Sequence, residues 1–461
     1  LRAVFLADRC RTDAMHLVGG KRHTNACAAD QYAERTRIGK HRLGRFFGIF
    51  RIVDACLFIR AEVDDMKAEA FDVLTQLVFQ IDRRMVVGDI DVFHNLSSLN
   101  CRNFRAFRLP GLFLLRNGTV IFFGCPAEEG AGSKQFMARA GMFDNVDFVY
   151  TWHPATINAV ECNHSNAIMG ANFEFKGVSS HAGGSPHLGR SALDAAELMN
   201  VGCNYLREHM IPEARIHYAY IDAGGTAPNV VQDHAVIRYE VRSPWVSQVK
   251  DLFERVKNVA RGASIMTDTT VDCELAMAFT EYIPNNALAA VADECMKEVG
   301  TPKWDEDDYA MAREFLNTYP PVTMENIKSQ IIEVFGEDRL EEILERPLDS
   351  EIHPFNPDKI KLTAGSTDVG DVGYAAPTLN INIATACIGN VGHSWQMVAQ
   401  TCSPLAHKGL LTAAKVMALA CVRTMDRPDV IEAAKKEVTK RNGGHYTCPL
   451  PDSVMPPLDT Y

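Results

Sequence analysis

The sequence lacks long apolar runs, paired cysteines and internal repeats. No apolar run approaches the length of about 18 residues that a membrane-spanning helix requires, so we expect no membrane association. The 13 cysteines lie singly, with no Cys-x-x-Cys pair. This spacing argues against a disulfide framework and favours reduced thiols in the cytoplasm. What is present is an ordinary globular composition, 47% hydrophobic and 23% charged, over 461 residues, which is long enough for two domains.

Lysine is scarce in the first quarter of the chain. Residues 1–110 contain 15 Arg and 3 Lys against 13 acidic residues, whereas the whole chain carries a net charge of −11. The arginines are scattered among apolar residues and form no stripe, so we expect no nucleic-acid partner. We hypothesise that this Arg-rich segment derives from a frame error, antisense reading or gene rearrangement. Resequencing the locus tests the idea, because an unbroken frame in independent isolates would contradict it.

Regular patterning begins near residue 111. Thr119–Phe123 predicts a strand, Lys134–Met142 a helix, and Val146–Thr151 a second strand that stops ahead of His153. A strand, loop, helix, strand order is typical of a parallel sheet, in which functional groups gather at the carboxyl ends of the strands. Both Glu128–Glu129 and His153 follow such ends, so we expect them at one edge of the sheet.

The middle of the chain has a different pattern, which predicts β-α-β-β-α-β, the order of a ferredoxin-like unit. Its named elements are Ala171–Phe175, Ser191–His209, Ile216–Ile221, Val236–Val241 and Val246–Arg261. Beyond it we expect a helix at Leu288–Gly300, helices over 302–360, a loop at Gly365–Gly373, a strand near Thr378–Ala384 and a last helix at Leu405–Met425.

The adjacent pair Glu128–Glu129 is the first candidate for chemistry. On an extended loop the two side chains diverge, so one can bind a metal while the other faces a bound water. A divalent cation lowers the pKa of bound water, and a second carboxylate can act as general base. Most isolated Glu pairs are solvated helix surface, but this pair lies after an apolar strand and a Cys-Pro turn. His153 and His393 supply the imidazoles that Zn or Mn would use, although each alone is equally a structural donor.

Three further residues could bind the substrate. His181 lies in a polar loop and could stabilise the oxyanion of a tetrahedral intermediate, or simply bond to backbone groups. Asn229 and Arg242 could hold a substrate carboxylate, Arg by its bidentate fork. The alternative for Arg242 is a surface salt bridge.

Together these residues lie in blocks that resemble the two-metal amidohydrolases, a family that includes aminoacylases, glutamate carboxypeptidases and p-aminobenzoyl-glutamate hydrolases. The last branch is the most similar. The resemblance spans about residues 113–425, and its blocks are Gly124–Gly130, Phe136–Gly141, Thr151–Pro154, Ser180–Gly184, Ala227–Val231, Gly365–Asp371 and Gly392–Trp395. The blocks Ser366–Asp371 and Gly392–Trp395 point to the aminobenzoyl-glutamate branch.

The resemblance implies an α/β fold: a mixed-sheet catalytic domain of the zinc-peptidase type (111–165 and 281–461) with an inserted α+β ferredoxin-like lid and dimerisation domain (166–280). It implies that Glu128 is the general base and His181 polarises the scissile carbonyl in a partner's active site. Glu129, His153 and His393 would be ligands of two divalent metal ions, Zn or Mn. Asn229 and Arg242 would bind the substrate carboxylate.

The implied reaction is hydrolysis of an N-acyl or N-aroyl amino acid, p-aminobenzoyl-glutamate first, by a homodimer or a heterodimer with a related subunit. The family's upstream metal-binding blocks have no counterpart in residues 1–112. Ile59–Asp64 faintly echoes one of them, and His94 and Cys101 are the nearest candidate ligands. The alternative is therefore a catalytically impaired homologue that serves as a dimerising or ligand-binding subunit.

Overall fold

The computed structural model describes residues 2–8, 119–358 and 361–457, with β1 known by its backbone alone. All of them belong to one compact unit, residues 1–10 and 101–461. The second unit, residues 11–100, lies outside the described residues, as do the predicted candidates Ile59–Asp64 and His94. Cys101 lies outside them as well.

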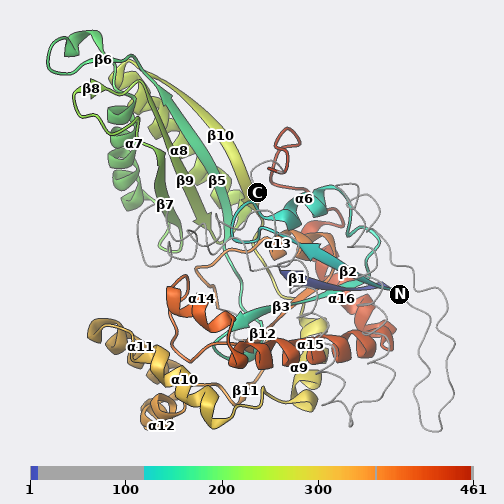
Figure 1. Ribbon diagram of the computed structural model, residues 1–461. Helices are drawn as coiled ribbons and strands as arrows, with labels where there is room; N and C mark the ends of the chain where they lie inside the picture. Colours follow the sequence, from blue (N-terminus) through green and yellow to red (C-terminus); the bar gives the residue numbers. More distant parts are fainter. Residues whose placement is uncertain (1, 9–118, 359–360, 458–461) are drawn as a thin grey trace, which may run out of the picture. The chain divides into compact units, whose positions relative to one another are not determined.

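The larger of the two main sheets has six strands in the order β11-β4-β12-β3-β1-β2 (Figure 1). The strands β12, β3, β1 and β2 run parallel, so their carboxyl ends meet at one edge. The strand β4 runs antiparallel to β12, which makes the sheet mixed. The bounds are β1 Arg2–Asp8, β2 Thr119–Cys125, β3 Phe148–Ala155, β4 Asn158–Val160, β11 Ile352–His353 and β12 Thr378–Ala384.

Helices cover both faces of this sheet, because its central strands are apolar on both sides. In β3, Phe148 and Tyr150 enter the cluster formed with α9, α15 and α16, whereas Val149 enters the opposite cluster with residues of α6 and α13. The bounds are α6 Ser133–Arg139, α9 Asn286–Val299, α13 Val369–Ala375, α15 Pro404–Met425 and α16 Pro428–Asn442. By length and composition α15 could cross a membrane, but half of its apolar window is buried, and it packs on β3, β12 and α9.

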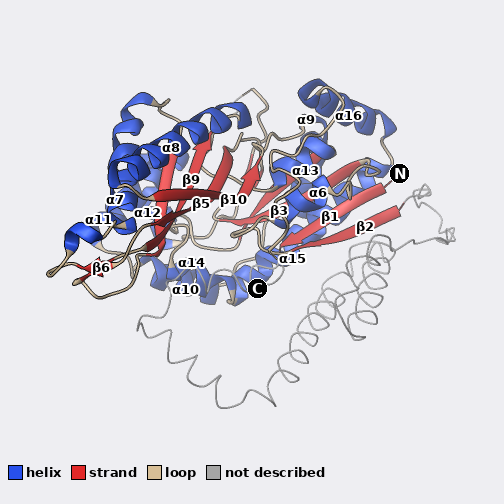
Figure 2. Cartoon of the chain, turned by 90° about the horizontal axis from the view of Figure 1, so that it is seen from above, coloured by secondary structure: helices blue, strands red, loops and turns tan. Residues whose placement is uncertain are grey.

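A four-stranded antiparallel sheet with the order β10-β5-β9-β7 forms between residues 167 and 279. Its chain order, β5-α7-β7-β9-α8-β10, confirms the predicted ferredoxin-like arrangement. Both α7 and α8 pack on one face of the sheet (Figure 2). The bounds are β5 Ala167–Lys176, α7 Ala192–Leu206, β7 Arg215–Asp222, β9 His234–Ser243, α8 Val246–Thr267 and β10 Thr270–Phe279.

Small elements complete the described chain. A two-stranded pair, β6 Ser180–His181 with β8 Val230–Val231, projects from the four-stranded sheet.

The predicted acidic helices are α10 Glu306–Leu316, α11 Pro321–Phe335 and α12 Leu340–Glu345, and they share an apolar cluster. A short helix, α14 Trp395–Thr401, follows the block that contains His393.

Two sequence expectations were wrong. The strand β3 does not stop ahead of His153 but continues to Ala155, because β12 pairs with it through that residue. Pro154 has no backbone N–H to donate to a neighbouring strand. It is tolerated because β1 pairs with β3 only as far as Thr151, so no described strand on the β1 side lies opposite Pro154. The predicted loop Gly365–Gly373 is helical from Val369 onward, as part of α13.

Candidate active site

The carboxyl edge of the six-stranded sheet carries the predicted general base Glu128 and the three predicted metal ligands. Glu128 and Glu129 follow β2, His153 lies near the end of β3, and His393 follows β12. The parallel direction of these strands brings their ends to the same edge, as expected from the sequence.

The turn that holds the Glu pair is tightly closed. The backbone N–H groups of Gly130 and Gly132 both donate to the carbonyl oxygen of Ala127, at 3.2 and 2.7 Å. Ala127 has a φ of 60°, in the left-handed region that costs an L-residue about 1–2 kcal/mol. His393 has a φ of 54°. Among the described residues only Asp268 is a further non-glycine residue with positive φ, so backbone strain gathers at this site, as it does at functional sites generally.

Glu129 and His393 meet across the edge. The Nε2 atom of His393 lies 3.9 Å from Oε2 of Glu129, and the side chains are 71% and 42% exposed. A carboxylate oxygen and an imidazole nitrogen at this spacing suit one divalent ion such as Zn or Mn. No described contact joins His153 to the pair. Across the part of the chain that the structure describes, no three His, Cys, Asp or Glu side chains gather as a metal site. Glu129 and His393 thus offer suitable donor atoms for a metal ion, but they supply only two of the three protein ligands that catalytic zinc uses.

Hydrogen bonds set the tautomers of two histidines in opposite senses. Nδ1 of His153 lies 2.7 Å from the carbonyl oxygen of Pro154, which can only accept, so Nδ1 carries the proton and Nε2 keeps a lone pair. Nδ1 of His181 instead accepts from the N–H groups of Gly183 and Gly184, at 3.1 and 3.0 Å. Its proton is therefore on Nε2. A neutral His153 ring is set to ligate through Nε2 and a neutral His181 ring to donate from it.

His181 and Asn229 lie together at the two-stranded pair β6–β8. His181 pairs with Val230 in β6–β8, and the N–H of Ala182 donates to the carbonyl oxygen of Asn229 at 2.9 Å. The pair β6–β8 lies at the end of the four-stranded sheet from which β9 begins (Figure 1).

Arg242 lies at the opposite end of β9. From His234, the first residue of the strand, to Arg242 the rise of about 3.4 Å per residue gives roughly 27 Å. Within one chain, Asn229 and Arg242 therefore cannot hold the same carboxylate. Arg242 approaches Glu240, with Nη2 3.6 Å from Oε2, as its salt-bridge alternative required. Its Nε is nevertheless buried without a hydrogen-bond partner among the described residues.

The block Ser366–Asp371 contributed to the family resemblance, but sequence reasoning gave its residues no role. Asp368 forms a buried ion pair with Lys134. Asp371 is fully buried and accepts from the Tyr446 hydroxyl at 2.8 Å and the Thr280 N–H at 3.1 Å. Burial, with the nearby carboxylates Asp368 and Glu281, raises the pKa of Asp371 to about 7 against these two hydrogen bonds. Two acidic residues, Asp368 and Asp371, within a block of the family resemblance were the available signal.

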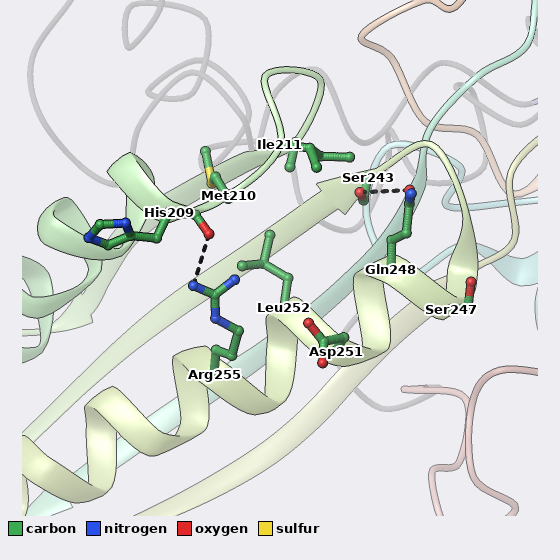
Figure 3. Close-up of a pocket in the computed structure, with 10 residues that line it drawn as sticks. His209, Met210, Ile211, Ser243, Ser247, Gln248, Asp251, Leu252 and Arg255 are labelled. Atoms are coloured by element: carbon green, nitrogen blue, oxygen red, sulfur yellow. Dashed lines mark hydrogen bonds between the residues drawn. The ribbon is translucent and has the colours of Figure 1, made fainter.

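A pocket of about 360 Å³ lies elsewhere, beside the start of α8 (Figure 3). Its lining includes Met210, Ile211, Gln248, Asp251 and Arg255. None of the predicted catalytic or metal-binding residues lines it, so it is separate from the chemistry proposed for the sheet edge.

A model of the peptidase dimerisation domain (M20_dimer) matches residues 163–265. One subunit of the p-aminobenzoyl-glutamate hydrolase from Escherichia coli (strain K12) is 38% identical over 345 residues, which is 74% of this chain and 72% of that protein. The Xaa-Arg dipeptidase of Mus musculus is 27% identical over 321 residues, 69% of this chain and 62% of that protein. Among solved structures, an aminobenzoyl-glutamate utilization protein from Klebsiella pneumoniae has a TM-score of 0.40 at 20% identity, covering 68% of this chain and 63% of that one.

The dimerisation-domain match and the 38% identity to the Escherichia coli subunit put the chain in the M20 group of peptidases and amidohydrolases, and the mixed α/β sheet with its inserted ferredoxin-like unit is consistent with that group. Within that class, the chain belongs to the p-aminobenzoyl-glutamate hydrolase family.

Proposed function

We propose that this chain hydrolyses the amide bond of an N-acyl or N-aroyl amino acid. The observation that carries the proposal is the approach of His393 to Glu129, next to Glu128, at the carboxyl edge of the sheet. The backbone there is strained at Ala127 and His393. Strained backbone persists where the surrounding structure holds it, and such sites are commonly functional.

Each residue has a distinct proposed task. Glu128 takes a proton from the attacking water and passes it to the leaving amine. Glu129, His393 and His153 are the residues that would hold the divalent ions, Zn or Mn. A bound ion lowers the pKa of water and so supplies the nucleophile. His181 donates from Nε2 to the carbonyl oxygen as negative charge develops there.

The leading candidate substrate is p-aminobenzoyl-glutamate, which would yield p-aminobenzoate and glutamate. Its support is the activity for which the Escherichia coli relative is named and the length over which the two chains align. The unpartnered Nε of Arg242 is suited to the glutamate carboxylate, since guanidinium binds carboxylate through parallel N–H groups.

The proposed assembly is a homodimer, or a heterodimer with a related subunit. We propose that residues 111–165 and 281–461 form the catalytic domain and 166–280 the dimerisation domain, in agreement with the family match at 163–265. About 27 Å of strand β9 separates Arg242 from the end of the sheet at which His181 and Asn229 lie. A substrate held by all three residues therefore requires two copies of this unit. The proposed location is the cytoplasm.

The second candidate is a metal-poor homologue that dimerises or binds ligand without hydrolysing it. The observation that favours it is the lack of a three-ligand group among the residues of the described ranges. Residues 1–112 also lack the metal-binding blocks expected there.

Metal analysis of the purified full chain separates the two candidates. About two equivalents of Zn or Mn are expected for the dinuclear enzyme, and at most one for the impaired homologue. Hydrolysis of p-aminobenzoyl-glutamate with added Mn then tests the substrate, with Glu128→Gln as the matched control. Release of p-aminobenzoate by the wild type at the rate of that variant would contradict the proposed activity.

A further inference from the structure

The ion pair between Lys134 and Asp368 is fully buried, with both side chains at 0% exposure. Nζ of Lys134 lies 2.9 Å from Oδ1 of Asp368, and the backbone N–H of Lys134 donates to Oδ2 at 3.0 Å. Across the described ranges, no other ion pair has both side chains without exposure. Removing two charges from water is costly, and a buried pair is weak evidence for stabilisation. The role of this ion pair is therefore better sought in the elements that it joins than in net stabilisation.

The pair joins the Glu128–Glu129 turn to α13. Lys134 is the second residue of α6, which begins directly after the turn, and Asp368 immediately precedes α13. One carboxylate thus bonds both the first turn of α6 and the lysine amine. The neighbouring side chain Gln135 adds a second tether, since its Oε1 accepts from the N–H of Ala278 at 3.1 Å and its Nε2 donates to Ala131 at 2.7 Å.

Close packing leaves these elements no room to shift. A Cβ atom on Gly132, the last residue before α6, would lie 2.2 Å from the ring of Phe279 in β10. A Cβ atom on Gly370 in α13 would lie 2.2 Å from the carbonyl oxygen of Thr280. The turn and α13 therefore both pack closely against the end of β10, and the ion pair joins the two.

We propose that Lys134 and Asp368 are positioning residues that hold the Glu128–Glu129 turn in its strained, catalytically required shape. The left-handed backbone at Ala127 is unfavourable by itself, so the turn keeps it because both of its ends are anchored: β2 lies on one side and the Lys134–Asp368 clamp on the other. The effect on catalysis rests on the proposed hydrolase function, whereas the effect on the turn does not.

The test uses the double variant Lys134→Met/Asp368→Asn in the full chain. Either single change leaves a buried charge without its partner and should lower the unfolding midpoint. The double variant removes both charges of the pair, and the Asn oxygen still accepts the backbone N–H, so its midpoint should fall less than that of either single variant. Hydrogen exchange of the amides at 128–132 should become about tenfold faster. The kcat for p-aminobenzoyl-glutamate should fall by about 100-fold with little change in KM.

The matched control is Lys408→Met/Asp308→Asn, the same pair of changes in a partly buried ion pair between α15 and α10. It should alter neither the exchange at 128–132 nor kcat. Unchanged exchange at 128–132 in the Lys134/Asp368 double variant overturns the clamp, and unchanged kcat with faster exchange overturns its part in catalysis. An inactive wild type overturns the proposed function alone, because hydrogen exchange still measures the clamp.

Discussion

Replacing Asp371 by Asn should remove a pH-dependent loss of stability. In the folded chain burial raises the pKa of Asp371 from its ordinary 3.8 to about 7. At about 1.4 kcal/mol per pKa unit, this difference corresponds to about 4 kcal/mol of folding free energy. Asn has the same shape, can accept the Thr280 N–H and can donate to the Tyr446 oxygen, and it does not ionise.

The sign follows from proton binding. As pH rises above 4, the unfolded chain releases the Asp371 proton while the folded chain keeps it until about pH 7. The folded state binds more protons in this window, so the contribution of Asp371 to stability falls from pH 4 to 7 and is constant above. The Asn variant, compared with the wild type, should therefore gain about 4 kcal/mol of relative stability across that window.

Urea unfolding of both chains at several pH values between about 4.5 and 8 measures this difference. Subtracting the two pH dependences of the unfolding free energy removes the contribution of the titrating groups that both chains share. Asp452→Asn, a change at an exposed carboxylate, serves as the control and should give a nearly flat difference. A flat difference for Asp371→Asn would refute the reasoning, because it would mean that Asp371 is ionised in the folded chain throughout.

Three further outcomes are expected. Glu128→Gln should lower kcat for amide hydrolysis by about 10²–10⁴-fold, and an unchanged kcat would exclude Glu128 as the base. Arg242→Lys should raise KM about tenfold with a smaller change in kcat, since a point charge replaces a bidentate fork; an unchanged KM would remove Arg242 from substrate binding. Gly370→Ala should cost about 1–3 kcal/mol in chemical unfolding, because its Cβ would lie 2.2 Å from a backbone oxygen. The control Gly262→Ala, with nothing within 4 Å, should not destabilise, and equal effects at both positions would contradict the steric argument.

Local sequence pattern predicted the elements well where alternation or helical spacing is strong. The strand Thr378–Ala384 was expected with its observed bounds, and Leu405–Met425 differs from α15 by one residue at its start. The pattern failed at His153, because Pro154 normally signals the end of a strand and only the absence of a paired neighbour on that side, among the described strands, permits it. It also failed at Val369, where glycines masked a short helix.

The family, the ferredoxin-like order and the candidate residues Glu128, Glu129 and His393 could be predicted without a structure, because each depends on the pattern within local segments. Which of these residues lie close together depends on the packing of distant segments. That packing joined Glu129 to His393, separated Asn229 from Arg242 along β9, and set the tautomers of His153 and His181. It also paired Lys134 with Asp368 across 234 residues. Such contacts depend on how distant segments pack, and no local pattern encodes the partner of a buried charge.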